Sequence, residues 1–131
     1  MPADEELRIT CIDHVQITIP TGQEAEGRAF YCDFLGLTEI PKPASLQGRG
    51  GFWLDGGNLA LHVGVEPAWD RGQTKTHVAF AMADISVWRD RFADAGYPLI
   101  DPVPIPGRDR FETTDPFGNR IEFITAAVCR G

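Results

Sequence analysis

The sequence predicts an α+β fold built from two βαβββ modules, because one pattern of elements occurs twice along the chain. Each half begins with a segment in which apolar and polar residues alternate, residues 12–19 and residues 76–83, as in a half-buried strand. A segment with helical spacing follows in each half and ends at a glycine, Gly36 or Gly96. These glycines lie 60 residues apart, as do other matching positions, which indicates one supersecondary unit used twice.

The first module is expected over about residues 10–66. Its opening strand is followed by Thr21-Gly22-Gln23-Glu24, a capping box that predicts a helix with Thr21 as its cap. Phe30 and Phe34 have the spacing of one helix face. Gly56-Gly57 predicts a turn between the last two strands. The remaining strands are expected at residues 37–41, 51–54 and 58–65.

The second module is expected over about residues 75–127, and both modules form one domain, residues 8–131. Asp84 is a suitable N-cap for a helix that ends at Gly96. Further strands are expected near residues 97–100, 108–114 and 120–125, with a turn at residues 116–119. The side chains expected to be buried between sheet and helices are Val15, Ile17, Phe30, Phe34, Val78, Phe80, Met82, Trp88 and Phe92.

Composition and charge limit the classes of partner. The chain has 19 acidic and 12 basic residues, a net charge of −7, which disfavours nucleic acid and anionic membranes as partners. The longest apolar run, Val78–Ala83, is far shorter than the ~20 residues of a transmembrane helix. The first residues lack the pattern of a secretory signal. Cys11, Cys32 and Cys129 form no CxxC pair, so we expect reduced thiols in a cytoplasmic protein.

Four potential metal ligands occupy equivalent positions in the two halves. His14 and His77 take the same place in the opening strands, and His62 and Glu122 take the same place in the last strands. A single histidine in a strand is usually a hydrogen-bonded core or surface residue. Here every histidine of the chain falls on a symmetric position, so we expect the four side chains to converge on one metal ion if the sheets curve together. Imidazole and carboxylate groups suit Zn, Ni, Mn or Fe.

Other polar residues of the strands are candidates for substrate contacts. Gln16 shares a strand face with His14. Arg108 and Arg110 carry guanidinium groups that suit carboxylates and phosphates, and the plainer interpretation of each is a solvated strand residue. Proton abstraction next to a carbonyl group needs a base with a near-neutral pKa, a role that fits His62, or Glu122 if this carboxylate leaves the metal.

Three motifs carry a resemblance to a known family. They are Asp-His-Val-Gln-Ile at residues 13–17, Phe-Tyr-x-x-Phe-Leu-Gly-Leu at 30–37 and Asp-Pro-Phe-Gly-Asn-Arg-Ile-Glu-Phe at 115–123. Over about residues 10–126 the chain resembles the vicinal oxygen chelate superfamily, which contains glyoxalase I, fosfomycin-resistance transferases, bleomycin-resistance proteins and extradiol dioxygenases. The resemblance implies a curved, mixed, mainly antiparallel sheet with helices on its convex side, and a homodimer.

The resemblance also implies a metal triad of His14, His77 and Glu122. His62 stands where glyoxalase I has a glutamate, and we expect it to be a fourth ligand, with a free base as the alternative. The expected function is a divalent-metal-dependent enzyme acting on a small oxygenated, anionic metabolite, as a lyase, isomerase or transferase. The alternatives are a metal-free binding protein of the bleomycin-resistance type and an iron(II) extradiol-type dioxygenase.

Overall fold

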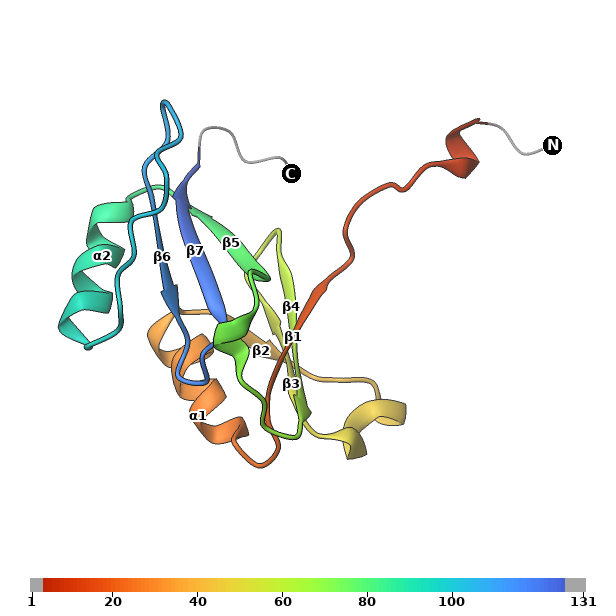
Figure 1. The fold of residues 1–131 in the computed structure, drawn as a ribbon. Coiled ribbons are helices and arrows are strands. Elements are labelled where there is room, and N and C mark those ends of the chain that lie inside the picture. The colour runs from red at the N-terminus through yellow and green to blue at the C-terminus, as the bar shows by residue number, and fades with distance from the viewer. Residues whose placement is uncertain (1–3, 127–131) are drawn as a thin grey trace.

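The structure is a computed structural model that describes residues 4–126. Its strands form two hydrogen-bonded sheets, one from each half of the chain (Figure 1). The first sheet has the order β1-β4-β3-β2 and the second the order β5-β7-β6. The strands are β1 (Val15–Pro20), β2 (Thr38–Ile40), β3 (Phe52–Asp55), β4 (Ala60–Glu66), β5 (His77–Met82), β6 (Arg110–Thr114) and β7 (Arg120–Thr125).

The sheets are mixed, as predicted. The pairs β1–β4 and β5–β7 are parallel, because a helix lies between the opening strand and the rest of each module. The pairs β2–β3, β3–β4 and β6–β7 are antiparallel and connected directly along the chain. No helix of the described residues is long and apolar enough to cross a membrane.

The first helix begins later than the capping box predicts. α1 spans Glu24–Arg28 and continues as a π-helical turn, η2 (Ala29–Phe34). Its N-cap is Gln23, whose side chain makes no capping hydrogen bond, so the prediction of Thr21 as the cap is wrong. The Gln23 amide donates to the Pro20 carbonyl oxygen over 3.2 Å, and Gly22 has a φ of 87°. Thr21 and Gly22 therefore form a tight turn out of β1, which leaves Thr21 outside the helix.

The second helix begins where the sequence predicts. α2 spans Ile85–Asp94, and the Asp84 carboxylate accepts a hydrogen bond from the Ser86 amide over 3.0 Å. Burial is negligible at Asp84, and its hydrogen bonds with Ser86 lower the pKa of this carboxyl group. The positive φ of Gly96 ends the helix, as the sequence indicates.

The strand predicted near residues 97–100 is reduced to a single bridge. Ile100 exchanges two backbone hydrogen bonds with Glu112 of β6, over 2.9 and 2.8 Å, and the pairing goes no further. The neighbouring segment contains Pro98, Pro102 and Pro104, which have no amide hydrogen to donate to a ladder. The prediction of a strand near residues 97–100 is therefore wrong in extent.

The hydrophobic core lies between the two sheets and the helices and is rich in aromatic rings. Phe92 of α2 contacts rings from both halves, among them Phe30 at 6.1 Å and Phe123 at 5.1 Å between centroids. Phe30 and Phe92 are buried as predicted, and partly buried side chains packed against the core include Ile17, Phe34, Phe80, Met82 and Trp88. Val78 is half-buried. Val15 is 38% exposed, so its predicted burial is wrong; it starts an edge strand whose preceding residues leave the body (Figure 1).

A buried carboxylate joins the two modules. Asp115, 3% exposed, accepts a hydrogen bond from the Tyr31 hydroxyl group over 2.7 Å. It also accepts bonds from the amides of Phe117 and Asn119 and from Asn119 Nδ2. The Asn119 side chain donates in turn to the Thr18 carbonyl oxygen over 2.9 Å. The turn between β6 and β7 is thereby fixed to both η2 and β1 of the first module.

Candidate metal centre and substrate site

Each sheet has one face that the helices do not cover, and the candidate site residues lie on these open faces. In β5 the exposed residues alternate with half-buried ones, so His77, Ala79 and Ala81 point away from the core. Glu122 lies beside Ala79 in the register of β5 and β7. Glu122 is also directly opposite Glu112 of β6. The strand register therefore brings one histidine and two carboxylates together on the second sheet.

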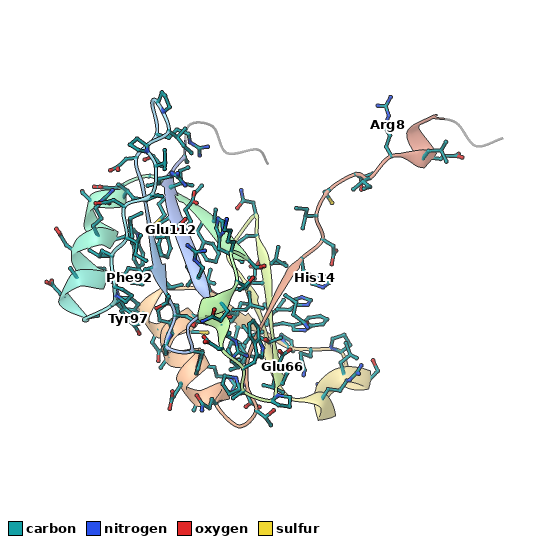
Figure 2. The ribbon with its side chains drawn as sticks, in the orientation of Figure 1. Arg8, His14, Glu66, Phe92, Tyr97 and Glu112 are labelled. Carbon is teal, nitrogen blue, oxygen red and sulfur yellow. The ribbon has the colours of Figure 1, made fainter. Side chains whose placement is uncertain are left out.

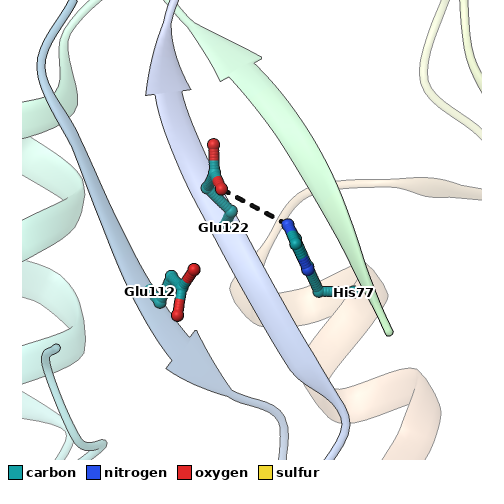
Figure 3. A group of neighbouring side chains, drawn as sticks. All are labelled: His77, Glu112 and Glu122. Atoms are coloured by element: carbon teal, nitrogen blue, oxygen red, sulfur yellow. Dashed lines mark ion pairs between the residues drawn. The ribbon is translucent and has the colours of Figure 1, made fainter. Parts of the chain in front are cut away.

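These three side chains are close enough to bind one metal ion (Figure 3). One ligand atom from each of His77, Glu112 and Glu122 lies within 4.8 Å of the others. His77 Nε2 is 3.4 Å from Glu122 Oε1. Two ligands at about 2.0–2.1 Å from a tetrahedral ion are separated by roughly this distance, so the pair fits a shared cation.

The hydrogen bonds of His77 indicate which ring nitrogen would bind. His77 Nδ1 lies 2.9 Å from the Lys75 carbonyl oxygen, which can only accept, so this nitrogen carries a hydrogen and donates it. In the neutral ring Nε2 then presents a lone pair to the Glu122 carboxylate oxygen. Two lone pairs at 3.4 Å repel each other unless a proton or a metal ion lies between them. A backbone carbonyl that fixes the other nitrogen is a usual support of a metal-binding histidine.

Two arginines compensate the carboxylates of this group. Arg110 donates to Glu122 Oε1 over 3.1 Å, and Arg120 donates to Glu112 Oε2 over 3.0 Å. Arg110 also donates to the Val103 carbonyl oxygen, while its buried Nε has no partner among the described residues. The Glu122 side chain is 8% exposed and that of Arg110 16%, so their ion pair is shielded from solvent. A metal at Glu122 would share its carboxylate with this guanidinium group.

The other two histidines stack on each other beside the first sheet. His62 lies in β4, whereas His14 directly precedes β1 and is not inside the strand as predicted. The rings of His14 and His62 are 3.9 Å apart and inclined by 16°, and Trp53 covers the other side of His62 at 3.9 Å and 6°. His14 Nδ1 is also 2.8 Å from Asp13 Oδ2. Burial, and then the proximity of His14, lowers the pKa of His62, so this ring is neutral at neutral pH.

This stack is not the geometry of two ligands on one ion. Ring-nitrogen lone pairs lie in the ring planes, and planes 3.9 Å apart at 16° meet on the order of 10 Å away, whereas a ligand nitrogen lies about 2.0–2.1 Å from its metal. Binding by both His14 and His62 would require at least one ring to turn.

Within the described residues, the structure does not bring the four predicted ligands together. The group of three or more potential ligands found there is His77, Glu112 and Glu122, and neither His14 nor His62 joins it. His14 lies at the foot of the N-terminal extension and Glu112 on the other sheet (Figure 2). Glu112 was missed by the sequence analysis, although its place opposite Glu122 in a hairpin around the predicted turn at residues 116–119 could have indicated it.

The predicted substrate-binding residues have different surroundings. Gln16 lines a pocket of about 700 Å³ together with His14, His62 and the cations Lys42 and Arg49. It also lines a pocket of about 330 Å³ at the seam of the modules, shared with His77 and Arg120. Arg110 binds Glu122, as described above. Arg108 donates two hydrogen bonds to the Thr125 carbonyl oxygen at the end of β7, three residues beyond Glu122.

Comparison with known families decides the assignment. Residues 12–123 match the Glyoxalase/Bleomycin resistance protein/Dioxygenase superfamily. The chain belongs to this superfamily. A protein from Bacillus anthracis assigned to the glyoxalase family is 42% identical, with 90% of this chain and 96% of that chain covered and a TM-score of 0.81. Comparison with curated protein sequences found no match.

More distant superfamily structures share the fold. The fosfomycin resistance protein FosX from Listeria monocytogenes is 13% identical, with 95% of this chain and 97% of that chain covered and a TM-score of 0.69. TnmS3, an antibiotic binding protein from Streptomyces sp. CB03234, is 17% identical, with 88% and 97% covered and a TM-score of 0.63. The superfamily fold thus occurs both in resistance proteins and in proteins that bind small molecules.

Proposed function

We propose that this glyoxalase superfamily member is a divalent-metal-dependent enzyme that acts on a small oxygenated, anionic metabolite as a lyase, isomerase or transferase. The observation that carries the proposal is the contact between His77 Nε2 and Glu122 Oε1 at 3.4 Å. With Nδ1 donating to a carbonyl oxygen, this contact is favourable when a cation is shared between the two atoms. Glu112 adds a second carboxylate oxygen within reach.

The proposed ligand set is His14, His77 and Glu122, with His62 as a fourth ligand or a base and Glu112 as an additional donor. His62 belongs to the first sheet and His14 directly precedes its strand β1, whereas the other ligands belong to the second sheet. We therefore propose a homodimer in which the first sheet of one copy faces the second sheet of the other. In that arrangement the open faces of both sheets, rather than one alone, surround the ion.

The chain's own side chains would orient the substrate and move its proton. A bound divalent ion supplies Lewis-acid stabilisation of negative charge on a substrate oxygen. Arg120 and Gln16, which line the same pocket, offer donors to an anionic group. His62 is neutral because its pKa is lowered, so it can accept a proton from carbon next to a carbonyl group. The exposed Ala79 and Ala81 leave space above the second sheet.

Metal analysis of purified variants tests the proposal. Protein prepared without chelators is expected to contain about one Zn, Ni, Mn or Fe ion per chain, and His77→Ala should lose most of it. Lys75→Ala is the matched control, because it removes a side chain two residues away but keeps the carbonyl group that holds the His77 ring. Full metal content in His77→Ala would refute the ligand assignment.

Two variants of His62 separate its possible roles. If His62 is a ligand, His62→Ala should lower the metal affinity, whereas His62→Glu should keep it near that of the wild type. If it is a base, both variants should keep the metal, while turnover falls in His62→Ala. The stacked arrangement with Trp53 and His14 supports the base, since the ring need not turn for that role.

One observation favours a metal-free binding protein as the second candidate. Arg110 already places a positive charge 3.1 Å from Glu122 Oε1, and so compensates the carboxylate without a metal. In that case the pockets beside the two sheets would bind a small molecule without chemical change. Two results together would favour this candidate. The purified protein would retain no Zn, Ni, Mn or Fe after dialysis against each ion, and a bound small molecule would be recovered chemically unchanged.

A further inference from the structure

An N-terminal arm exposes apolar side chains that no other part of residues 4–126 covers. Residues 7–14, here called the arm, project from the body of the molecule and lead into β1 (Figure 1). Leu7 is 70% exposed, Ile9 93% and Ile12 79%. Leu7 ends the 3₁₀ helix η1, and Ile9 and Ile12 follow it. Single exposed aliphatic residues are ordinary, but three so close together in the chain favour an apolar partner.

A second apolar surface lies beside the candidate metal group. Residues 99–105, here called the proline loop, contain Leu99 at 41%, Ile100 at 47%, Val103 at 80% and Ile105 at 40% exposure. The loop is attached to the site at two points, because Ile100 pairs with Glu112 and the Val103 carbonyl oxygen accepts a hydrogen bond from Arg110. Its prolines restrict the backbone, so this surface is largely formed before any partner binds.

The arm and the proline loop each lie next to proposed metal ligands that lie apart within one chain. His14 ends the arm directly before β1 of the first sheet, and His77 and Glu122 lie on the second sheet next to the proline loop. A histidine that completes the ligand group of a second copy brings the residues before it to the same sheet. At about 3.3 Å per residue, Ile12 lies within roughly 7 Å of His14 and Ile9 within roughly 17 Å, a span that reaches the loop.

We propose that the arm of one chain packs against the proline loop of a second copy of this chain, reciprocally in a symmetric dimer. This contact deepens the proposed function and rests on its assumption that His14 of one copy joins His77 and Glu122 of the other. The arm then buries Ile9 and Ile12 and holds His14 in place. The occupant is a second copy because the same chain carries both complementary surfaces and the missing ligand.

Cross-linking tests the contact directly. Cys11 is an exposed native thiol in the arm, between Ile9 and Ile12. In a Cys32→Ala, Cys129→Ser background, Val103→Cys should give a covalent dimer with a short bis-maleimide, and adding Cys11→Ser should abolish this cross-link. Val87→Cys is the matched control, because Val87 is 51% exposed and belongs to α2 rather than to the proline loop. Cross-linking no greater than in this control would count against the contact.

Dimer affinity provides the second measurement. Ile9→Asp combined with Ile12→Asp should weaken dimerisation by about 100-fold or more in analytical ultracentrifugation, because two buried side chains become charged and exposed. Val87→Asp should leave the affinity unchanged. Equal dimerisation of the Ile9/Ile12 variant and the wild type, or a monomeric wild type at micromolar concentration, would overturn the proposal.

Metal content separates this proposal from the proposed function. A wild type that holds one metal per chain but gives no arm–loop cross-link refutes the contact and leaves the metal site standing. A specific cross-link in protein that binds no metal supports the contact and refutes the metal-dependent function. When both hold, the Ile9/Ile12 variant should also bind metal more weakly, since it positions His14 less well.

Discussion

Removing the Tyr31 hydroxyl group is expected to loosen the junction of the two modules. Tyr31 is 1% exposed, and its hydroxyl group donates to Asp115 Oδ2 over 2.7 Å. Burial, and then the Asp115 charge, raises the pKa of Tyr31 well above its usual value, so the hydroxyl group remains a donor at all pH values in ordinary use. Tyr31→Phe deletes this donor and leaves the ring in the aromatic core.

The expected loss of stability follows from the charge on the acceptor. A hydrogen bond to an ionised group is worth about 1.5–3 kcal/mol, and the Asp115 carboxylate keeps three donors after the change. The lower half of that range applies if water enters beside Oδ2. For a chain of 131 residues, 1 kcal/mol shifts Tm by roughly 3–4 °C, so Tm should fall by about 5–10 °C.

Urea unfolding followed by circular dichroism measures the effect, with thermal unfolding as a check. Tyr97→Phe is the matched control, because Tyr97 belongs to the same aromatic cluster and its hydroxyl group makes no hydrogen bond to any described residue. Its stability should change by less than about 0.5 kcal/mol. If both variants unfold like the wild type, the Tyr31–Asp115 hydrogen bond contributes no stability and the reasoning is wrong.

Three further variants probe backbone and charge. Gly51→Ala should destabilise the fold by about 3 kcal/mol or more in urea unfolding, since Gly51 has a φ of 77° and a Cβ there would collide with the Val63 carbonyl oxygen. Gly57→Ala is the control, because Gly57 has a φ of 89° but open space around it, and it should cost about 1–2 kcal/mol. Arg110→Gln should raise divalent-metal affinity about tenfold or more in calorimetry, because it removes a cation beside Glu122. Weaker binding in that variant would show instead that Arg110 mainly positions the carboxylate.

Local pattern in the sequence was enough to predict most elements of the fold. The prediction of β7 at residues 120–125 agrees with the structure to the residue, and the Asp84 cap and the end of α2 at Gly96 are confirmed, because alternation, capping and glycine are local signals. The errors come from competing local chemistry. Gly22 formed a turn that displaced the Thr21 cap, and prolines stopped the strand near residues 97–100.

The candidate site was less predictable, because it depends on which strands become neighbours. Internal symmetry indicated His77 and Glu122, which the structure brings to 3.4 Å. It did not indicate Glu112, which follows from the β6–β7 register, or the Arg110 ion pair, which depends on side-chain direction. The placement of His14 and His62 by symmetry remains a prediction, since within one chain they lie at the first sheet and His77 and Glu122 lie on the second.

The contacts at Asp115 can form only late in the synthesis of the chain. Tyr31 and Asp115 are 84 residues apart, and Thr18 and Asn119 are 101 residues apart, so the first module emerges from the ribosome long before its partners exist. At about 5–20 residues per second this interval is roughly 4–20 s. Until the second module is made, Phe30 of η2 lacks the contact with the Phe92 ring that it has in the folded chain. The nascent first module therefore exposes an aromatic ring that the second module contacts in the folded protein.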